Sequence, residues 1–198
     1  MWAIGNGESR TPIDIDRLTD TKIGCNAIFR DYQIDHIVCV DRRMMEEALR
    51  ANANQNSYLY TRNDWWSRYS TEKRTRIVPD LPYAGSERWD EPFQWGSGPY
   101  AVLLAAKKSK TDYVNLLGFD LHSKTKTVNN VYKNTPNYDA ASKKAVDPRY
   151  WVHQIGMVFK YFPKIKFKIY QEPDWVLPKA WKYTNVSLDN ISNISYNN

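Results

Sequence analysis

Two glycine-spaced turns hold the residues that are best suited to binding a ligand. Gly5–Gly7 follows the apolar run WAI, and Gly96–Pro99 precedes the apolar run YAVLLAA. Glycine permits a sharp turn and lets a ligand approach backbone N–H groups, which suits a phosphate or a nucleoside. At the second turn the first N–H groups of a helix would add their dipole, with the Ser97 hydroxyl as a further donor. A plain tight turn and a helix cap are the alternatives, because short glycine motifs also arise by chance.

The first turn departs from the dinucleotide-binding fingerprint. That fingerprint requires a third glycine where Arg10 stands. It also requires an acidic residue at the end of the second strand, where Cys25 and Asn26 stand. The sequence therefore disfavours NAD as a ligand.

Three polar residues lie at the ends of apolar runs. These residues are Asn26, Asp41 and Asp120. Each would also serve as a cap for the helix or loop that follows it, because Asn and Asp are well suited to that role. The carboxyl ends of parallel strands share one edge of a sheet, so we expect the three side chains to converge there.

The hydrophobic pattern alternates between short strands and helices. Apolar residues at helical spacing predict helices at 42–50, 99–108 and 148–162. Short apolar runs predict strands at 2–5, 22–28, 36–41, 58–61, 76–78, 113–120 and 166–170. This alternation predicts one α/β domain over residues 1–198, Rossmann-like, with a mainly parallel sheet and helices on both faces. The aperiodic segments are predicted to be a loop over 79–98, a lid over 121–147 and a polar tail over 184–198.

Composition sets limits on the partners and the setting. The chain has 198 residues, is 42% hydrophobic and carries a net charge of +6. No stretch approaches the roughly 18 apolar residues of a membrane span, and no secretory signal precedes the first strand, so we expect a cytoplasmic protein. The lysines are scattered, so nucleic acid ranks below nucleotide phosphates and acidic glycans as a partner. Without a CxxC spacing or a histidine cluster we expect no metal site, with Cys25, Cys39 and His36 as structural residues.

Four stretches of the chain carry a resemblance to a known group of enzymes. They are GNGES, IGCNAIF, DHIVCVD and WGSGPYAVLLAAKKSKTDYVNLLGFDL. In order and spacing they resemble the bacterial sialyltransferase-like group, whose relatives include motility-accessory glycosyltransferases and archaeal-type hydroxymethyldihydropterin pyrophosphokinases. The likeness covers most of residues 2–121 and extends weakly to 150–170. In the sialyltransferases the matching turns surround the cytidine monophosphate part of the donor. The resemblance therefore implies nucleotide contacts from Gly5, Asn6, Gly7, Asn26, Ser97 and Gly98.

The resemblance also implies a lid and a catalytic base. Family members have lid tyrosines that hold the leaving phosphate, and Tyr132 and Tyr138 lie in the matching loop. The family's catalytic histidine precedes the late helix, where this chain has Val146 and Asp147, so the sequence departs from the family at that point. The candidate bases that would activate an acceptor hydroxyl are Asp41, Asp120, His122 and His153.

We expect a nucleotide-sugar-dependent glycosyltransferase with a glycan or protein acceptor, and the compact length suggests a viral member, such as a phage protein. The nucleotide sugar is the donor substrate, and no further cofactor is implied. One alternative is a non-catalytic binding or assembly protein on the same fold, which would use aromatic residues such as Trp65 and Trp89. Another is a pyrophosphokinase-like phosphotransferase, in which Asp41 and Asp120 would act with magnesium.

Overall fold

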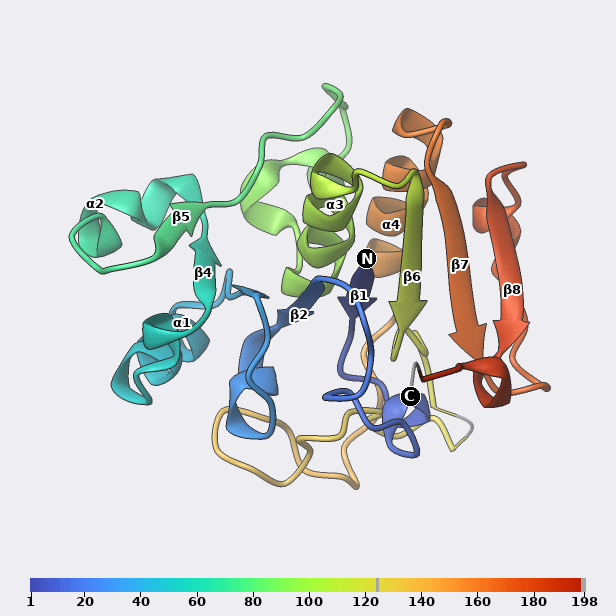
Figure 1. Ribbon diagram of the computed structural model, residues 1–198, viewed down its shortest axis with the longest axis horizontal. Helices are drawn as coiled ribbons and strands as arrows, with labels where there is room; N and C mark the ends of the chain where they lie inside the picture. The colour runs from blue at the N-terminus through green and yellow to red at the C-terminus, as the bar shows by residue number, and fades with distance from the viewer. Residues whose placement is uncertain (124, 197–198) are drawn as a thin grey trace.

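A single sheet of eight parallel strands runs through the molecule (Figure 1). The computed structural model describes residues 1–123 and 125–196. The strand order is β5-β4-β3-β2-β1-β6-β7-β8, and every neighbouring pair is parallel. The strands are β1 (Trp2–Ile4), β2 (Lys22–Cys25), β3 (His36–Val38), β4 (Tyr58–Thr61), β5 (Thr75–Ile77), β6 (Tyr113–Leu117), β7 (Lys166–Gln171) and β8 (Val186–Asn190). The helices are α1 (Arg42–Arg50), α2 (Trp66–Tyr69), α3 (Ser97–Lys108) and α4 (Arg149–Tyr161). The prediction of a Rossmann-like α/β fold is confirmed.

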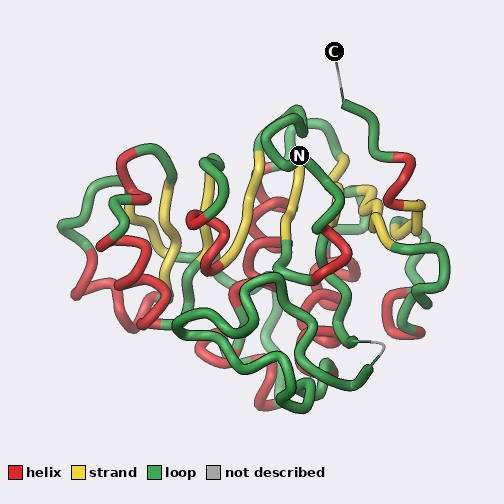
Figure 2. Tube along the Cα trace, turned by 90° about the horizontal axis from the view of Figure 1, so that it is seen from below, coloured by secondary structure: helices red, strands yellow, loops and turns green. Residues whose placement is uncertain are grey.

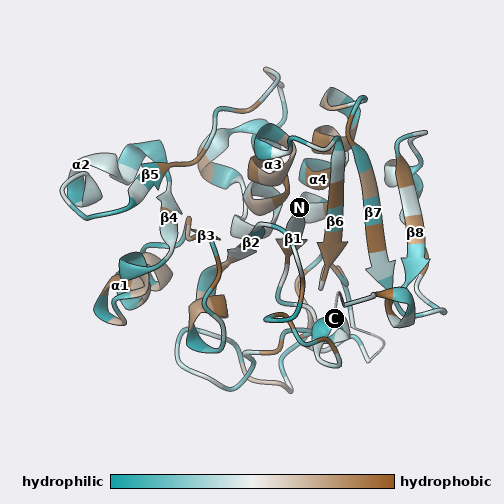
Figure 3. Cartoon of the chain, in the orientation of Figure 1, coloured by the Kyte–Doolittle hydropathy of each residue, from teal (hydrophilic) through white to brown (hydrophobic). Residues whose placement is uncertain are grey.

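Both faces of the sheet are buried, each by its own hydrophobic core. Successive residues of a strand point to opposite faces, so Ala3 joins one core while Trp2 and Ile4 join the other. On the first face α3 packs over the central strands and against α4, and it is therefore buried on nearly all sides. On the second face lie α1 and a 3-10 helix, η2 (Asn26–Arg30). Figure 2 shows the helices and loops around the sheet from below, and β6 is mostly apolar in Figure 3.

The strand order changes direction between β1 and β6, so this is the switch point of the sheet. Strands β2 to β5 extend the sheet on one side of β1, and β6 to β8 extend it on the other. The two loops that leave this point touch each other, because the Gly5 N–H donates to the Leu117 carbonyl at 2.8 Å. A Cβ atom on Gly5 would lie 2.3 Å from the Gly118 carbonyl oxygen, and Gly118 itself has φ of +73°. Glycine is therefore required at both positions of this crossing.

Several predicted boundaries differ from the structure; for example, the strands predicted at 36–41 and 113–120 end at Val38 and Leu117. The second predicted strand ends at Cys25, because the residues after it turn into η2. Helix α3 begins at Ser97, two residues earlier than predicted. The prediction of a polar tail over 184–198 is wrong for residues 186–190, which form β8 and pair with β7. Because β8 is an edge strand with no fully buried residue, it lacks the apolar pattern that revealed the other strands.

The segment 121–147 lies beyond the carboxyl ends of the strands, drawn in yellow to orange in Figure 1. Its described residues form no helix or named strand, and one antiparallel bridge joins Thr127 to Lys144. Arg30 of η2 holds the middle of the segment by donating to Thr135 Oγ1 at 2.7 Å and to the Pro136 carbonyl at 2.8 Å. This segment therefore closes over the edge of the sheet where the predicted site residues lie.

Candidate functional site

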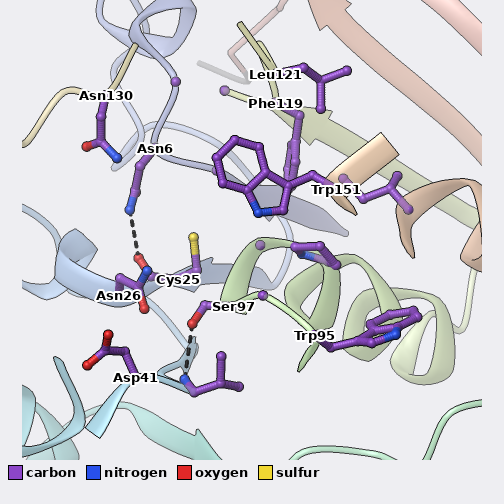
Figure 4. A pocket seen from close by; sticks show the side chains of 18 of the residues that line it. Asn6, Cys25, Asn26, Asp41, Trp95, Ser97, Phe119, Leu121, Asn130 and Trp151 are labelled. Carbon is purple, nitrogen blue, oxygen red and sulfur yellow. Dashed lines mark hydrogen bonds between the residues drawn. The ribbon is translucent and has the colours of Figure 1, made fainter. Parts of the chain in front are cut away.

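A cavity of about 710 Å³ lies at the carboxyl edge of the sheet, and we call it the carboxyl-edge pocket. Its walls come from the turns after β1, β2, β3 and β6, from the start of α3 and from the first turns of α4. All six predicted nucleotide contacts line it: Gly5, Asn6, Gly7, Asn26, Ser97 and Gly98. Figure 4 shows the side chains of Asn6, Asn26, Asp41 and Ser97 brought around it from four segments. The two glycine-spaced turns therefore belong to one site at one edge of the sheet.

Glycine is present in the two turns for different physical reasons. A Cβ on Gly7 would lie 2.4 Å from the Asp120 carboxyl carbon, so Gly7, like Gly5, is required by close packing. A Cβ on Gly98 would have its nearest neighbour, a Phe119 ring carbon, at an ordinary 3.5 Å. Packing therefore does not explain the glycine at position 98, which leaves the backbone open to the pocket.

Two asparagine side chains present unused acceptors in the pocket. The Asn6 amide nitrogen donates to the Cys25 carbonyl and to the Tyr138 hydroxyl, both at 3.3 Å. The Oδ1 atoms of Asn6 and Asn26 are buried and have no hydrogen-bond partner among the described residues. Asn26 has φ of +50°, a conformation that asparagine tolerates better than most residues. Since a buried acceptor without a donor costs free energy, both oxygen atoms are suited to a ligand that carries hydroxyl or amino groups.

Hydrogen bonds to other elements fix the position of the start of α3. The Ser97 hydroxyl accepts the Val40 N–H at 3.0 Å, and the Gly96 N–H donates to Gln154 Oε1 at 3.3 Å. Gly96 has no side chain to cap the helix, and within the described part of the chain no side chain accepts from the Ser97 or Gly98 N–H, so these two groups remain at the pocket with the positive end of the helix dipole. An anion is the natural ligand of such a helix start.

Gln154 was missed by the sequence analysis. It is fully buried on α4, and its amide nitrogen also donates to the carbonyls of Trp89 and Gln94 at 3.3 and 3.1 Å. It therefore fixes the segment before α3 as well as the Gly96 N–H. The available signal was a polar residue between apolar positions of a predicted helix.

Asp120 lines the pocket, but its carboxylate is used in hydrogen bonds to neighbouring elements. It accepts the Ser9 N–H at 2.9 Å, the Ser9 hydroxyl, and the Gln171 amide at 3.0 Å. The side chain is 6% exposed. Asp120 thus joins the end of β6 to the turn after β1 and to β7, which is a structural use of the carboxylate.

The two histidines proposed as bases lie outside the pocket lining. His122 is exposed. His153 places Nε2 2.6 Å from Asp90, which also accepts the Tyr83 hydroxyl at 2.8 Å. Burial acts to raise the pKa of Asp90, but the hydrogen bonds from His153 and Tyr83 outweigh it and the pKa falls below its ordinary value. The structure therefore brings neither histidine to the cavity.

Asp41 is the predicted base that remains beside the cavity with an accessible carboxylate. It caps α1 by accepting the Arg43 N–H at 2.8 Å, and its side chain is 49% exposed. Arg42, Arg43 and Arg62 line the same part of the pocket. Each of these guanidinium groups has an acidic neighbour, because Arg42 pairs with Glu46, Arg43 with Asp41 and Arg62 with Asp64.

Of the two lid tyrosines, Tyr132 is buried and Tyr138 is partly buried, and neither lines the pocket. The Tyr132 hydroxyl accepts from Arg10 Nη2 at 2.8 Å, and the Tyr138 hydroxyl accepts from Asn6 and from the Ala27 N–H at 3.4 Å. Burial is the main cause that raises the pKa of both phenols. The lid lines the pocket with Leu121, Asn129 and Asn130 and not with the two tyrosines.

Cysteine and metal chemistry find no support at this site. Cys25 and Cys39 are buried free thiols, and burial raises the pKa of Cys25 to about 12, so it stays protonated at neutral pH. Within residues 1–123 and 125–196 there is no group of three or more His, Cys, Asp or Glu side chains placed to hold a metal ion.

Comparisons with known protein families, curated proteins and solved structures give no match to this chain. None of the described helices has the length and apolar character needed to span a membrane. Function must therefore be argued from the geometry of the pocket.

Proposed function

We propose that this protein binds a nucleotide in the carboxyl-edge pocket and uses a nucleotide sugar as the donor in glycosyl transfer. One observation carries the proposal: the six residues that the resemblance matches to nucleotide contacts come from distant segments and all line one cavity, beyond the carboxyl ends of the paired strands β1 and β6. Open parallel α/β sheets commonly bind ligands at this switch point. The cavity volume of about 710 Å³ lies within the range of small-molecule sites.

The polar groups of the pocket suit the two halves of a nucleotide. The unpaired Oδ1 atoms of Asn6 and Asn26 would accept hydrogen bonds from the hydroxyl or amino groups of a nucleoside. The N–H groups of Ser97 and Gly98 would bind its phosphate at the start of α3. The Ser97 hydroxyl, which accepts from Val40, keeps its own proton for donation.

In the transfer step Asp41 is the proposed general base. Its carboxylate is the accessible one at the pocket, and it would take the proton of an acceptor hydroxyl. Arg42 and Arg43 beside it would stabilise the negative charge that develops on the departing phosphate. The two lid tyrosines would act indirectly, because Tyr138 holds Asn6 in place.

A second candidate is nucleotide binding without turnover. It is favoured by the hydrogen bonds that occupy Asp120 and by the pairing of His153 with Asp90 outside the pocket. A binding protein would keep the contacts of Asn6 and Asn26 and would need no base.

Titration calorimetry with a panel of nucleotides and nucleotide sugars, with and without magnesium, tests both candidates. Replacing Asn26→Ala or Ser97→Ala removes one buried hydrogen bond to the ligand, worth about 1–3 kcal/mol, so affinity should fall roughly 5- to 150-fold. The control is Asn56→Ala, an exposed asparagine outside the pocket lining. Asp41→Asn should retain binding and lose transfer.

The outcomes separate the candidates. The absence of any binding heat from folded protein would overturn nucleotide binding altogether. Binding without breakdown of any nucleotide sugar would assign the protein to the second candidate. Equal losses of affinity in Asn26→Ala and Asn56→Ala would mean that the carboxyl-edge pocket is not the nucleotide site.

A further inference from the structure

A second hollow lies at the opposite, amino-terminal edge of the sheet, and we call it the amino-edge groove. Its volume is about 600 Å³. Its floor contains the first residues of β3 and β4, His36 and Tyr58, whereas the carboxyl-edge pocket lies beyond the other ends of the strands. The groove therefore cannot be part of the proposed nucleotide pocket.

The floor of the groove is a part of the sheet that α3 leaves open. Tyr60 belongs to the core beneath α3. Tyr58 points to the same face because it lies two residues before Tyr60 in β4, and Arg76 does so because it pairs directly with Tyr60 across β4 and β5. Helix α3 packs mainly on β1, β2, β3 and β6. Tyr58 consequently remains 38% exposed. The open face is aromatic, with Trp66 as a further ring in its wall.

Cations border this floor on two sides. In strand order Arg76 lies on the β5 side, and Lys108 at the end of α3 lies on the β3 side. The guanidinium carbons of Arg74 and Arg76 lie 5.8 and 5.3 Å from the centre of the Tyr58 ring, which orients them. Within the part of the chain that the structure describes, Arg74, Arg76 and Lys108 have no ion-pair partner, and none of the seven lining residues is acidic.

We propose that the amino-edge groove binds single-stranded nucleic acid, with phosphates on Arg74, Arg76 and Lys108 and a base against Tyr58 and Trp66. A guanidinium group can donate two parallel hydrogen bonds to one phosphate, and aromatic rings beside a basic groove stack on bases. A duplex would keep its bases stacked inside and leave the rings without a partner. An acidic peptide would match the charges and leave the same rings uncovered. The sequence did not show this site because its cations come from separate segments that only the fold brings together.

His36 fits this assignment as an uncharged part of the floor. Burial, assisted by the positive charge of Lys108, lowers its pKa to about 4 although Asp35 acts in the opposite direction. Its ring lies 5.6 Å from the rings of both Tyr58 and Tyr60, and Tyr60 Oη lies 3.4 Å from Nδ1. The histidine therefore holds the aromatic floor together, and the charge for phosphate comes from the three cations around it.

Fluorescence anisotropy with a labelled oligothymidylate of about 12 nucleotides tests the proposal, because known single-strand sites span about 4–16 nucleotides. At about 50 mM salt the double variant Arg74→Gln/Arg76→Gln should bind at least about 10-fold more weakly than the unchanged protein. The slope of log affinity against log salt should fall by about 1.4, since each lost single-strand phosphate contact contributes about 0.7. Tyr58→Ala should weaken binding roughly 5-fold or more and change that slope by less than the double variant does, because it removes a stacking partner and leaves both positive charges in place.

The matched control is Lys179→Gln/Lys182→Gln, which removes the same charge from exposed positions outside the groove. It should change the affinity less than about 2-fold. No binding by the unchanged protein at low salt, or an equal loss in control and groove variants, would overturn the proposal. So would full displacement of the strand by an equal charge concentration of polyglutamate, or by free thymidine monophosphate at the same nucleotide concentration. None of these outcomes bears on nucleotide binding at the carboxyl-edge pocket, which calorimetry measures separately.

Discussion

Asn6 and Tyr138 lie 132 residues apart in the chain, and the Asn6 amide donates to the Tyr138 hydroxyl at 3.3 Å. The hydrogen bond joins the turn after β1 to the segment 121–147 that covers the edge of the sheet. Asn6 itself lines the pocket with Asn26 and Ser97, and its Oδ1 is buried without a hydrogen-bond partner among the described residues. The lid therefore influences the pocket through Asn6, although its tyrosines do not line the cavity.

Tyr138→Phe should weaken nucleotide binding about 3- to 10-fold, because Asn6 loses one of its two acceptors and about 1 kcal/mol of orientation. The matched variant Tyr132→Phe removes the bond to Arg10 but keeps both hydrogen bonds of the Asn6 amide nitrogen, so it should lower the free energy of unfolding without changing affinity. Calorimetric titration and denaturant unfolding of both variants measure the two effects. Equal affinity in the two variants would show that the lid does not act through Asn6.

Gly98→Ala should separate binding from stability. The added Cβ has ordinary contact distances and alanine favours a helix, so unfolding should become harder or stay unchanged. The methyl group would occupy the space before the free N–H groups of α3, and we expect nucleotide affinity to fall at least about 10-fold. Gly5→Ala is the contrasting variant, since its Cβ would meet the Gly118 carbonyl and should destabilise the fold. Thermal unfolding and titration of both proteins check this, and unchanged affinity in Gly98→Ala would place the phosphate elsewhere.

The sequence predicted most of the sheet because parallel strands buried on both faces are short apolar runs. Helix α1 has the predicted bounds, and the strand ends that carry Asn26, Asp41 and Asp120 meet at one edge, since that convergence follows from strand direction alone. Strand β8 was not predicted because it lies at the edge of the sheet, where it pairs with β7 alone, and its residues are mostly polar.

The hydrogen-bond partners of individual polar side chains could not be predicted from the sequence. Asp120 bonds to Ser9, and His153 pairs with Asp90, across 111 and 63 residues respectively. No periodicity encodes such pairs, because they depend on how loops pack after the sheet has formed. The sequence therefore predicted which residues have the right type for a base, but only the structure shows that their side chains are already hydrogen-bonded to other residues.

Asp120→Asn should reduce stability and not catalysis specifically. The carboxylate accepts from Ser9 and Gln171 while buried, and an amide in its place would set a donor against the Ser9 N–H or the Gln171 amide. The expected loss is about 1–3 kcal/mol in the free energy of unfolding. Asp41→Asn, at a half-exposed position, should unfold within about 1 kcal/mol of the unchanged protein and lose transfer activity. Denaturant melts and a transfer assay of the two variants decide between the roles, and the reverse pattern would make Asp120 the base.

The stability of the protein should fall as the pH drops from about 6.5 to 4, and His36 should be a main cause. Its folded pKa of about 4 lies below the ordinary value of 6.5, so over this range the unfolded chain binds a proton that the folded chain excludes. The contribution is fully present above pH 6.5 and is lost as the pH falls to about 4, by about 1–3 kcal/mol. Asp90 acts at lower pH, because its pKa lies below the ordinary 3.8 and its contribution is lost as the pH falls below that value. Urea unfolding of His36→Gln at pH 7 and pH 4.5 checks the assignment, since this variant should lose less stability between the two than the unchanged protein. An identical loss in both proteins would assign the pH dependence to other groups.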